Sequence, residues 1–228
     1  MKTNLLIFNS IIDPVAVKEF DIAIRKIFQP FPISFTIRYL HDTAPPFLLQ
    51  NFTHLLLSGS EMRASQHNNS DDIFYALINH FVAADKAVLG ICYGHQIIAR
   101  ALTGNSVCKP ADSPEFGWRK VRCSTNPLFT GIHQYVFFES HYDEVYDLPA
   151  DFEIIAATSE VAVQGYQYSG RRIWGVQFHP EVDIAKGKKM LARTFTRDQA
   201  AAMHFRNELP AGHDITQNYR IFSNFIKM

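Results

Sequence analysis

The sequence contains little cysteine: only three residues in 228, at positions 92, 108 and 123. This number and the irregular spacing exclude a disulfide framework and a cysteine-based zinc site. We therefore expect a protein of the reduced cytoplasm, with no metal and no cofactor. An odd number of cysteines also leaves room for a single reactive thiol, if one of them has a special setting.

The chain also lacks an excess of either charge and any long hydrophobic run. It has 22 basic and 22 acidic residues, so no global field attracts nucleic acid or an anionic membrane. No stretch approaches the roughly 18 apolar residues of a membrane span. The short run Leu5–Phe8 is broken by polar residues and has no small-residue cleavage site, so it predicts a buried strand and not a signal peptide. We expect neither a nucleic-acid partner nor a membrane partner.

Repeats, low-complexity tracts and linkers are missing as well, which favours one domain over residues 1–228. In the first half, short apolar runs alternate with segments of helical periodicity. The predicted strands are 5–8, 33–40, 54–57 and 87–91. The predicted helices are 15–28, a helix that begins after Ser70 as its N-cap, and 94–102. This alternation predicts an α/β fold, a mostly parallel central sheet flanked by helices.

The middle of the chain has a different pattern, with short strands and little helical periodicity between them. These strands, predicted at 116–123, 135–139, 152–157, 161–168 and 172–178, indicate a mixed or antiparallel extension of the same sheet. A last helix places Ile215, Tyr219, Phe222 and Ile226 on one face. The pattern of residues 184–213 is the hardest to interpret. This segment could form a lid, a surface for a partner or a solvated excursion.

The segment around Cys92 carries the most chemistry. An apolar strand leads directly into Gly90-Ile91-Cys92-Tyr93-Gly94, and a helix follows. This is a nucleophile elbow with sulfur in place of the serine oxygen, and its glycines allow a sharp, strained turn. The positive end of the following helix favours the thiolate. The competing interpretation is a buried, inert cysteine, the commonest fate of a lone cysteine.

A base for Cys92 is predicted where a strand ends at Pro180. Residues two apart project to the same side of an extended chain, so Glu181 can accept a hydrogen bond from one nitrogen of His179. The other nitrogen then faces the nucleophile, which completes a Cys–His–Glu triad. The competing interpretation is a strand-terminating His-Pro turn followed by an exposed glutamate.

Together, Gly90–Gln96 and Gly175–Glu181 resemble the class I, triad-type glutamine amidotransferases, and specifically their guanylate-synthase-like free-standing branch. Leu55–Ser60 is similar to the oxyanion loop of that family, and Glu139–Val145 is similar to its Ser-His-x-Asp stretch. The resemblance extends from residue 1 to about 183 and includes the final helix. It implies the flavodoxin-like amidotransferase fold and hydrolysis of glutamine through a cysteine thioester.

The resemblance also implies roles for individual residues. Cys92 attacks the carboxamide, His179 protonates the leaving ammonia, and Glu181 holds the imidazolium. The backbone N–H of Tyr93 and one from the Gly59–Ser60 loop bind the oxyanion. The amino-acid end of the substrate is assigned to a further set of residues, Gln96 and the backbone of Ser140, His141 and Tyr142.

Two positions depart from the family pattern. Ser60 and Tyr142 stand where the family usually has glycine, and a side chain at either place narrows or reshapes the substrate slot. The identity of the substrate is therefore less well determined than the triad.

Three functions are consistent with the sequence. The first is a glutaminase that supplies ammonia to a synthase on a separate chain, because no P-loop or pyrophosphatase-type loop is recognisable. The second is a stand-alone γ-glutamyl hydrolase or peptidase that cleaves a γ-glutamyl amide other than glutamine, an alternative that Tyr142 favours. The third is an inactive regulatory binding protein, which the intact set of three catalytic groups argues against.

Overall fold

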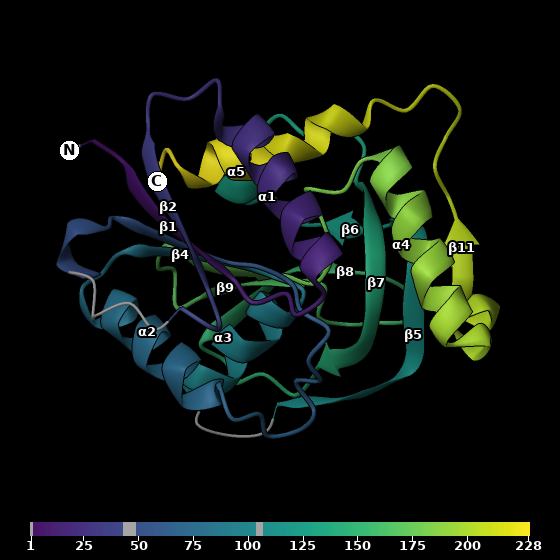
Figure 1. The fold of residues 1–228 in the computed structure, drawn as a ribbon, viewed down its shortest axis with the longest axis horizontal. Coiled ribbons are helices and arrows are strands. Elements are labelled where there is room, and N and C mark those ends of the chain that lie inside the picture. Colours follow the sequence, from purple (N-terminus) through teal and green to yellow (C-terminus); the bar gives the residue numbers. More distant parts are fainter. Residues whose placement is uncertain (1, 43–48, 104–106) are drawn as a thin grey trace.

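Five parallel strands form one half of the central sheet in the computed structural model, which describes residues 2–42, 49–103 and 107–228 (Figure 1). In spatial order these strands are β2 (Ser34–Tyr39), β1 (Asn4–Asn9), β3 (His54–Leu57), β4 (Ala87–Ile91) and β10 (Ile173–Val176). The inner strands β3, β4 and β10 are short apolar runs buried along their whole length between helices on the two faces, whereas the edge strand β2 is only partly buried.

Three antiparallel strands continue the sheet beyond β10. They are β9 (Gly165–Tyr168), β8 (Phe152–Ala157) and β6 (Arg122–Cys123), in that order. The predicted α/β fold with a mixed extension is thus confirmed. The predicted strand at 161–168 begins later, at Gly165.

A second, three-stranded sheet holds the other middle strands, and here the prediction of a single sheet is wrong. β5 (Cys108–Lys120) lies between antiparallel β7 (Val136–Val145) and parallel β11 (Phe205–Asn207). The apolar pattern of a strand shows that it is buried but not which strand it pairs with. Residues 116–120 and 135–139 therefore could not be assigned to a sheet from their sequence.

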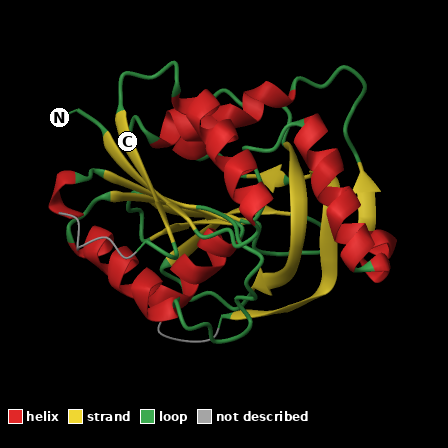
Figure 2. Ribbon diagram, viewed as in Figure 1, coloured by secondary structure: helices red, strands yellow, loops and turns green. Residues whose placement is uncertain are grey.

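Helices cover both faces of the central sheet (Figure 2). α1 (Pro14–Phe28) and α5 (Arg220–Phe225) lie on one face, and α2 (Asp71–Ala83) and α3 (Tyr93–Thr103) lie on the other. The remaining helix, α4 (Ile184–Arg197), packs on the second sheet, where Leu191 joins Phe116, Trp118 and Phe138 in a third apolar cluster.

The helix ends show how far local signals determine the chain. α1 begins with Pro14, and the Asp13 carboxylate caps it by accepting from two backbone N–H groups. Ser70 stands at the N-cap position of α2 as predicted, but its hydroxyl bonds to Met62 Sδ at 3.5 Å and makes no capping hydrogen bond.

The predicted last helix is split into two parts. A 3₁₀ turn, Ile215–Tyr219, precedes α5, and the remaining 3₁₀ segments are Leu49–Asn51, Pro127–Phe129 and Gln199–His204. Phe222 and Ile226 are buried in the core of the central sheet, whereas Ile215 belongs to the third cluster. None of the helices that the structure describes is long and apolar enough to cross a membrane.

Candidate active site

Three adjacent parallel strands end at the place where the predicted catalytic residues lie. β3 leads into Ser58 and Gly59, β4 leads into Cys92, and β10 leads by two residues to His179. Because β3, β4 and β10 are neighbours in the sheet, their carboxyl ends bring these three segments to one edge. This edge is where open α/β folds place their sites.

Cys92 occupies a strained turn between β4 and α3. Its φ of 50° lies in the left-handed region, which a residue with a side chain rarely adopts. A Cβ on Gly90 would stand 2.3 Å from the carbonyl oxygen of Gly94, and one on Gly94 would stand 2.5 Å from that of Leu57. The two glycines are therefore required by close backbone contacts, as the elbow motif predicts.

His179 is held by its backbone N–H and by one nitrogen of its ring. Its backbone N–H donates to the carbonyl of Phe138 on β7 at 2.8 Å, which joins the end of β10 to the second sheet. Its Nδ1 lies 2.9 Å from Glu181 Oε1. The predicted His–Glu pair is thus formed, and both side chains are buried.

The Gly59 backbone lies directly against Cys92 and His179. A Cβ at position 59 would stand 3.0 Å from His179 Cε1 and 3.4 Å from Cys92 Cβ. The imidazole and the cysteine therefore both pack against the loop that follows β3. A larger residue at 59 would push against both catalytic side chains.

The charges of the three groups are coupled. Burial by itself lowers the pKa of His179, but the Glu181 carboxylate and the Cys92 side chain outweigh it and raise that pKa to about 10. Burial raises the pKa of Glu181, and the neighbouring imidazolium reverses this effect and brings it below its ordinary value. The raised pKa favours the doubly protonated form of His179 beside Cys92.

A cleft of about 270 Å³ opens over the triad. Nine of the ten predicted site residues line it: Gly59, Ser60, Cys92, Gln96, Ser140, His141, Tyr142, His179 and Glu181. The tenth, Tyr93, has its side chain buried beneath the elbow, where its hydroxyl donates to Asp71 at 3.2 Å. As the first residue of α3, Tyr93 still has a backbone N–H without a partner inside the helix.

Two of the predicted substrate-binding side chains are already engaged with the protein. The Ser60 hydroxyl donates to the carbonyl of Ser10 at 2.7 Å and accepts from the Met62 N–H at 3.2 Å. Gln96 Nε2 donates to the carbonyl of Asp143 and to Gln177 Oε1, both at 2.9 Å. This leaves the Gln96 carbonyl oxygen as the atom that can accept from a ligand.

Consecutive residues of β7 send their side chains to different places. The Ser140 carbonyl lies 4.0 Å from Cys92 Sγ. The His141 ring is buried against Glu115. The Tyr142 hydroxyl donates to Asp198, just beyond α4, at 3.0 Å. Tyr142 therefore joins the wall of the cleft to the segment whose role the sequence left open.

Helix α4, the first part of the segment 184–213, forms a wall of the cleft, which the sequence pattern did not predict. Five residues of α4 line it, with positions spaced as on one helix face: Lys186, Met190, Arg193, Thr194 and Arg197. Arg193 makes a two-pronged ion pair with Glu19 of α1, and Arg197 bonds to Asp13. The spacing of basic residues on one face was the available signal, but it does not reveal the partner helix.

A further missed contact lies opposite α4. Arg63 pairs with the buried Asp143 carboxylate, which also accepts from the Ser65 N–H at 2.9 Å. The Arg63 guanidinium stands 5.4 Å from the centre of the Tyr142 ring. Asp143 thus ties the loop after β3 to β7 and closes this side of the cleft.

Comparison with known proteins identifies the family. Residues 16–198 match the model for class-I glutamine amidotransferases. One subunit of a GMP synthase (glutamine-hydrolyzing) from Methanococcus maripaludis is 30% identical over 168 residues, which cover 71% of this chain and 87% of the relative. A GMP synthase (glutamine-hydrolyzing) from Bacteroides fragilis is 38% identical over 114 residues, or 49% of this chain. The match spans only 22% of that longer relative.

The fold agrees with solved structures of the same kind. The crystal structure of a glutamine amidotransferase from Thermotoga maritima superposes with a TM-score of 0.76 at 18% identity, and the match covers 100% of both chains. At this identity the likeness shows the fold alone, and the family follows from the sequence match. The chain belongs to the class-I glutamine amidotransferase family.

Proposed function

We propose that the chain is a glutaminase in which Cys92, His179 and Glu181 hydrolyse the side-chain amide of glutamine through a thioester. The observation that carries this proposal is the cysteine at a strained strand end beside a buried His–Glu pair, all three lining one cleft. Family membership supports the reaction class. The geometry supports the roles that we give to the individual residues.

In the first step the Cys92 thiolate attacks the carboxamide carbon. The negative charge moves to the carbonyl oxygen, which needs donors that are already in position. The Tyr93 N–H at the start of α3 and an N–H of the Gly59–Ser60 loop are the donors we assign, each typically worth about 2.7–4 kcal/mol. The close packing of Gly59 against Cys92, and the position of Tyr93 directly after Cys92 in the chain, support this choice.

In the second step His179 gives its proton to the leaving nitrogen. Ammonia departs, the thioester remains on Cys92, and the imidazole is left neutral. It then takes a proton from a water that attacks the thioester, which releases glutamate and restores the ion pair. Glu181 keeps the ring oriented and stabilises its positive charge, since it accepts from Nδ1 throughout.

The released ammonia would pass to a synthase. The Methanococcus relative is named as one subunit of its enzyme, which supports an acceptor on a separate chain. Relatives named GMP synthase make a nucleotide-amidating synthase the first partner to test.

A second candidate is a hydrolase of other γ-glutamyl amides. Tyr142 favours it, because this side chain and α4 give the cleft a wall that the family's usual glycine would leave open. In this case the same thioester chemistry would release an amine or a peptide in place of ammonia.

The two candidates are separated by a direct assay. Purified protein is incubated with glutamine and with a panel of γ-glutamyl dipeptides, while ammonia and free amino acid are measured. If the chain is a glutaminase, it should release ammonia from glutamine faster than it releases an amino acid from any γ-glutamyl dipeptide. Cys92→Ala should abolish both reactions, and Cys123→Ala is the matched control, since Cys123 lies outside the cleft. Undiminished hydrolysis by Cys92→Ala would remove Cys92 from the mechanism.

A further inference from the structure

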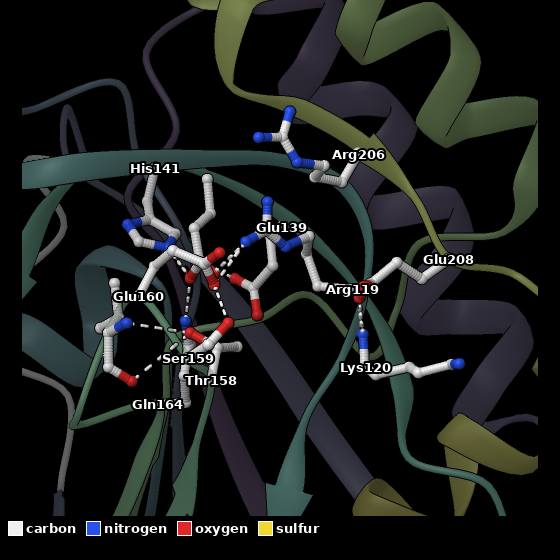
Figure 3. Close-up of polar contacts among 12 residues, drawn as sticks. Arg119, Lys120, Glu139, His141, Thr158, Ser159, Glu160, Gln164, Arg206 and Glu208 are labelled. Carbon is white, nitrogen blue, oxygen red and sulfur yellow. Dashed lines mark hydrogen bonds and ion pairs between the residues drawn. The ribbon is translucent and has the colours of Figure 1, made fainter.

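A second cluster of ionisable side chains is buried between β5 and β7, beside the cleft. Glu115, Glu139 and His141 are 0%, 0% and 3% exposed. Figure 3 shows His141 and Glu139 turned toward the same point, with Arg119 and Gln164 nearby. Glu115 and His141 are direct partners in the β5–β7 register. The proposed hydrolysis uses none of these three side chains.

The hydrogen bonds of His141 leave a conflict at its other nitrogen. Nδ1 lies 3.0 Å from the backbone carbonyl of Asp143, so Nδ1 carries the proton. The other ring nitrogen, Nε2, points toward Glu115 Oε2 at 3.2 Å and Glu139 Oε2 at 3.6 Å. This ring nitrogen and two carboxylate oxygens therefore converge on one point, where either a proton or a metal ion offsets the negative charge.

The protein's own cation does not resolve this conflict. Arg119 Nη2 lies 3.0 Å from the other oxygen of Glu115 and 2.7 Å from Glu160, so its charge is shared by these two carboxylates. Among the described residues, neither oxygen of Glu139 has a hydrogen-bond donor.

A second buried group lacks a partner at the same place. Gln164 is fully buried, and its Nε2 donates to Glu115 Oε2. Its carbonyl oxygen has no hydrogen-bond donor in the described part of the chain. Buried polar atoms are almost always satisfied, so the unsatisfied acceptors of Glu139 and Gln164 indicate a ligand near this cluster.

We propose that Glu115, Glu139 and His141 bind a divalent metal ion, with the Gln164 Nε2–H holding the Glu115 carboxylate in place. The three ligand atoms lie within 4.8 Å of one another. Metal–ligand bonds of about 2.0–2.2 Å require donor atoms roughly 3.0–3.6 Å apart, as the two His141 distances are. The Asp143 carbonyl supplies the outer bond that typically orients a metal-binding histidine.

The donor set indicates the kind of ion. One imidazole with carboxylate oxygens suits a first-row ion such as Zn²⁺ or Mn²⁺, whereas Mg²⁺ and Ca²⁺ prefer oxygen alone. Because its ligands come from both strands, the ion would link β5 to β7 within the protein interior. β7 carries the Phe138 carbonyl that accepts from His179, and the Ser140 carbonyl near Cys92. The site is therefore structural, and it would stiffen the strand that supports the triad.

The test uses the full chain in a Cys92→Ala background, because a thiolate–imidazole pair can itself bind Zn²⁺. Protein stripped with EDTA is titrated with Zn²⁺, and bound metal and thermal unfolding are measured. We expect one ion per chain and a rise in Tm of roughly 5–10 °C at a hundredfold excess over Kd. Co²⁺ should give visible bands without the charge-transfer band of a sulfur ligand.

Two variants make the result specific to the cluster. Glu139→Gln should remove the Zn²⁺-dependent rise while leaving the stripped protein at least as stable, because an unpaired buried carboxyl is lost. Glu144→Gln is the matched control, since this residue lies on the same strand but pairs with Lys109. It should keep the full rise.

The outcomes that overturn the proposal are equally direct. If the Cys92→Ala protein gains neither bound metal nor a higher Tm, a proton and not a metal occupies the cluster. An equal Zn²⁺ effect in Glu139→Gln would place the metal elsewhere. If Glu139→Gln does not fold, the stoichiometry and the Co²⁺ spectrum of the parent protein still decide the question.

Discussion

Two buried histidines, His179 and His141, stand in similar sequence settings and have different chemistry. Each has a glutamate two residues away in the sequence, and each has its Nδ1 engaged: one by Glu181, the other by a backbone carbonyl. The difference lies at Nε2. In His179 this nitrogen faces Cys92 and the open cleft, whereas in His141 it faces two carboxylates inside the protein.

A histidine close to a glutamate in the sequence is therefore not necessarily a catalytic base. His179 follows the end of a central parallel strand, next to the elbow of the adjacent strand. His141 lies within β7, where neighbouring strands close around its ring. The end of the strand, and not the residue pattern alone, makes a histidine available to a substrate.

The largest expected effect is at His179. His179→Ala should lower kcat/KM by about 10⁴–10⁶-fold, because the leaving nitrogen then has no proton donor and Cys92 has no counter-charge. Glu181→Gln should cost less, about 10²–10⁴-fold, since the ring keeps a neighbour but loses its stabilising charge. Steady-state kinetics on the same batch check both, with circular dichroism as the control for folding. Equal activity of Glu181→Gln and wild type would remove Glu181 from the triad.

His141→Ala should act on stability more than on chemistry. Removing the ring opens a cavity between β5 and β7 and takes the Nδ1 donor from the Asp143 carbonyl, which together cost about 2–5 kcal/mol of unfolding free energy. Urea unfolding measures this loss. Adding Glu139→Gln to the same chain should recover part of it, because one of the opposed carboxylates is removed. If His141→Ala were as stable as wild type, the His141 ring would contribute nothing to the free energy of unfolding.

A third prediction concerns pH. The pKa of His179 is raised from its ordinary 6.5 to about 10, so its contribution to stability is complete below about pH 6.5 and is lost as pH rises through about 10. The difference in unfolding free energy between wild type and His179→Gln should therefore shrink steadily between these values. Urea unfolding at several pH values measures it. Cys92 helps to raise this pKa. In a Cys92→Ala background the difference in unfolding free energy should therefore reach its high-pH limit at a lower pH. A difference independent of pH would contradict the assigned charge state.

The part of the site that the sequence predicted is the part that local rules determine. The elbow needs Gly90 and Gly94 because the backbone approaches too closely for a Cβ, and a glycine-x-cysteine-x-glycine pattern records that need directly. The His–Glu pair depends on a spacing of two residues at a strand end. Both signals lie within a few residues of the chain.

The part that the sequence did not predict depends on contacts between distant segments. The α4 wall is held by Arg193 on Glu19, and the β7 wall by Asp143 on Arg63. The separate sheet of β5, β7 and β11 depends in the same way on partner choice, which the strand pattern does not encode. The candidate metal site was missed because its ligands come from two strands and include no cysteine.

The smallest expected effect is at Ser60, one of the two departures from the family pattern. Its hydroxyl is bound to the Ser10 carbonyl, whereas the Tyr142 side chain spans the wall of the cleft toward Asp198. Ser60→Gly should therefore change kcat/KM for glutamine by less than about threefold, and cost about 1–2 kcal/mol of stability through the lost hydrogen bonds and added chain entropy. Tyr142→Gly should shift the ratio of glutamine to γ-glutamyl dipeptide hydrolysis instead. Kinetics of both variants on both substrates check this, because a tenfold gain from Ser60→Gly would mean that Ser60, and not Tyr142, narrows the slot.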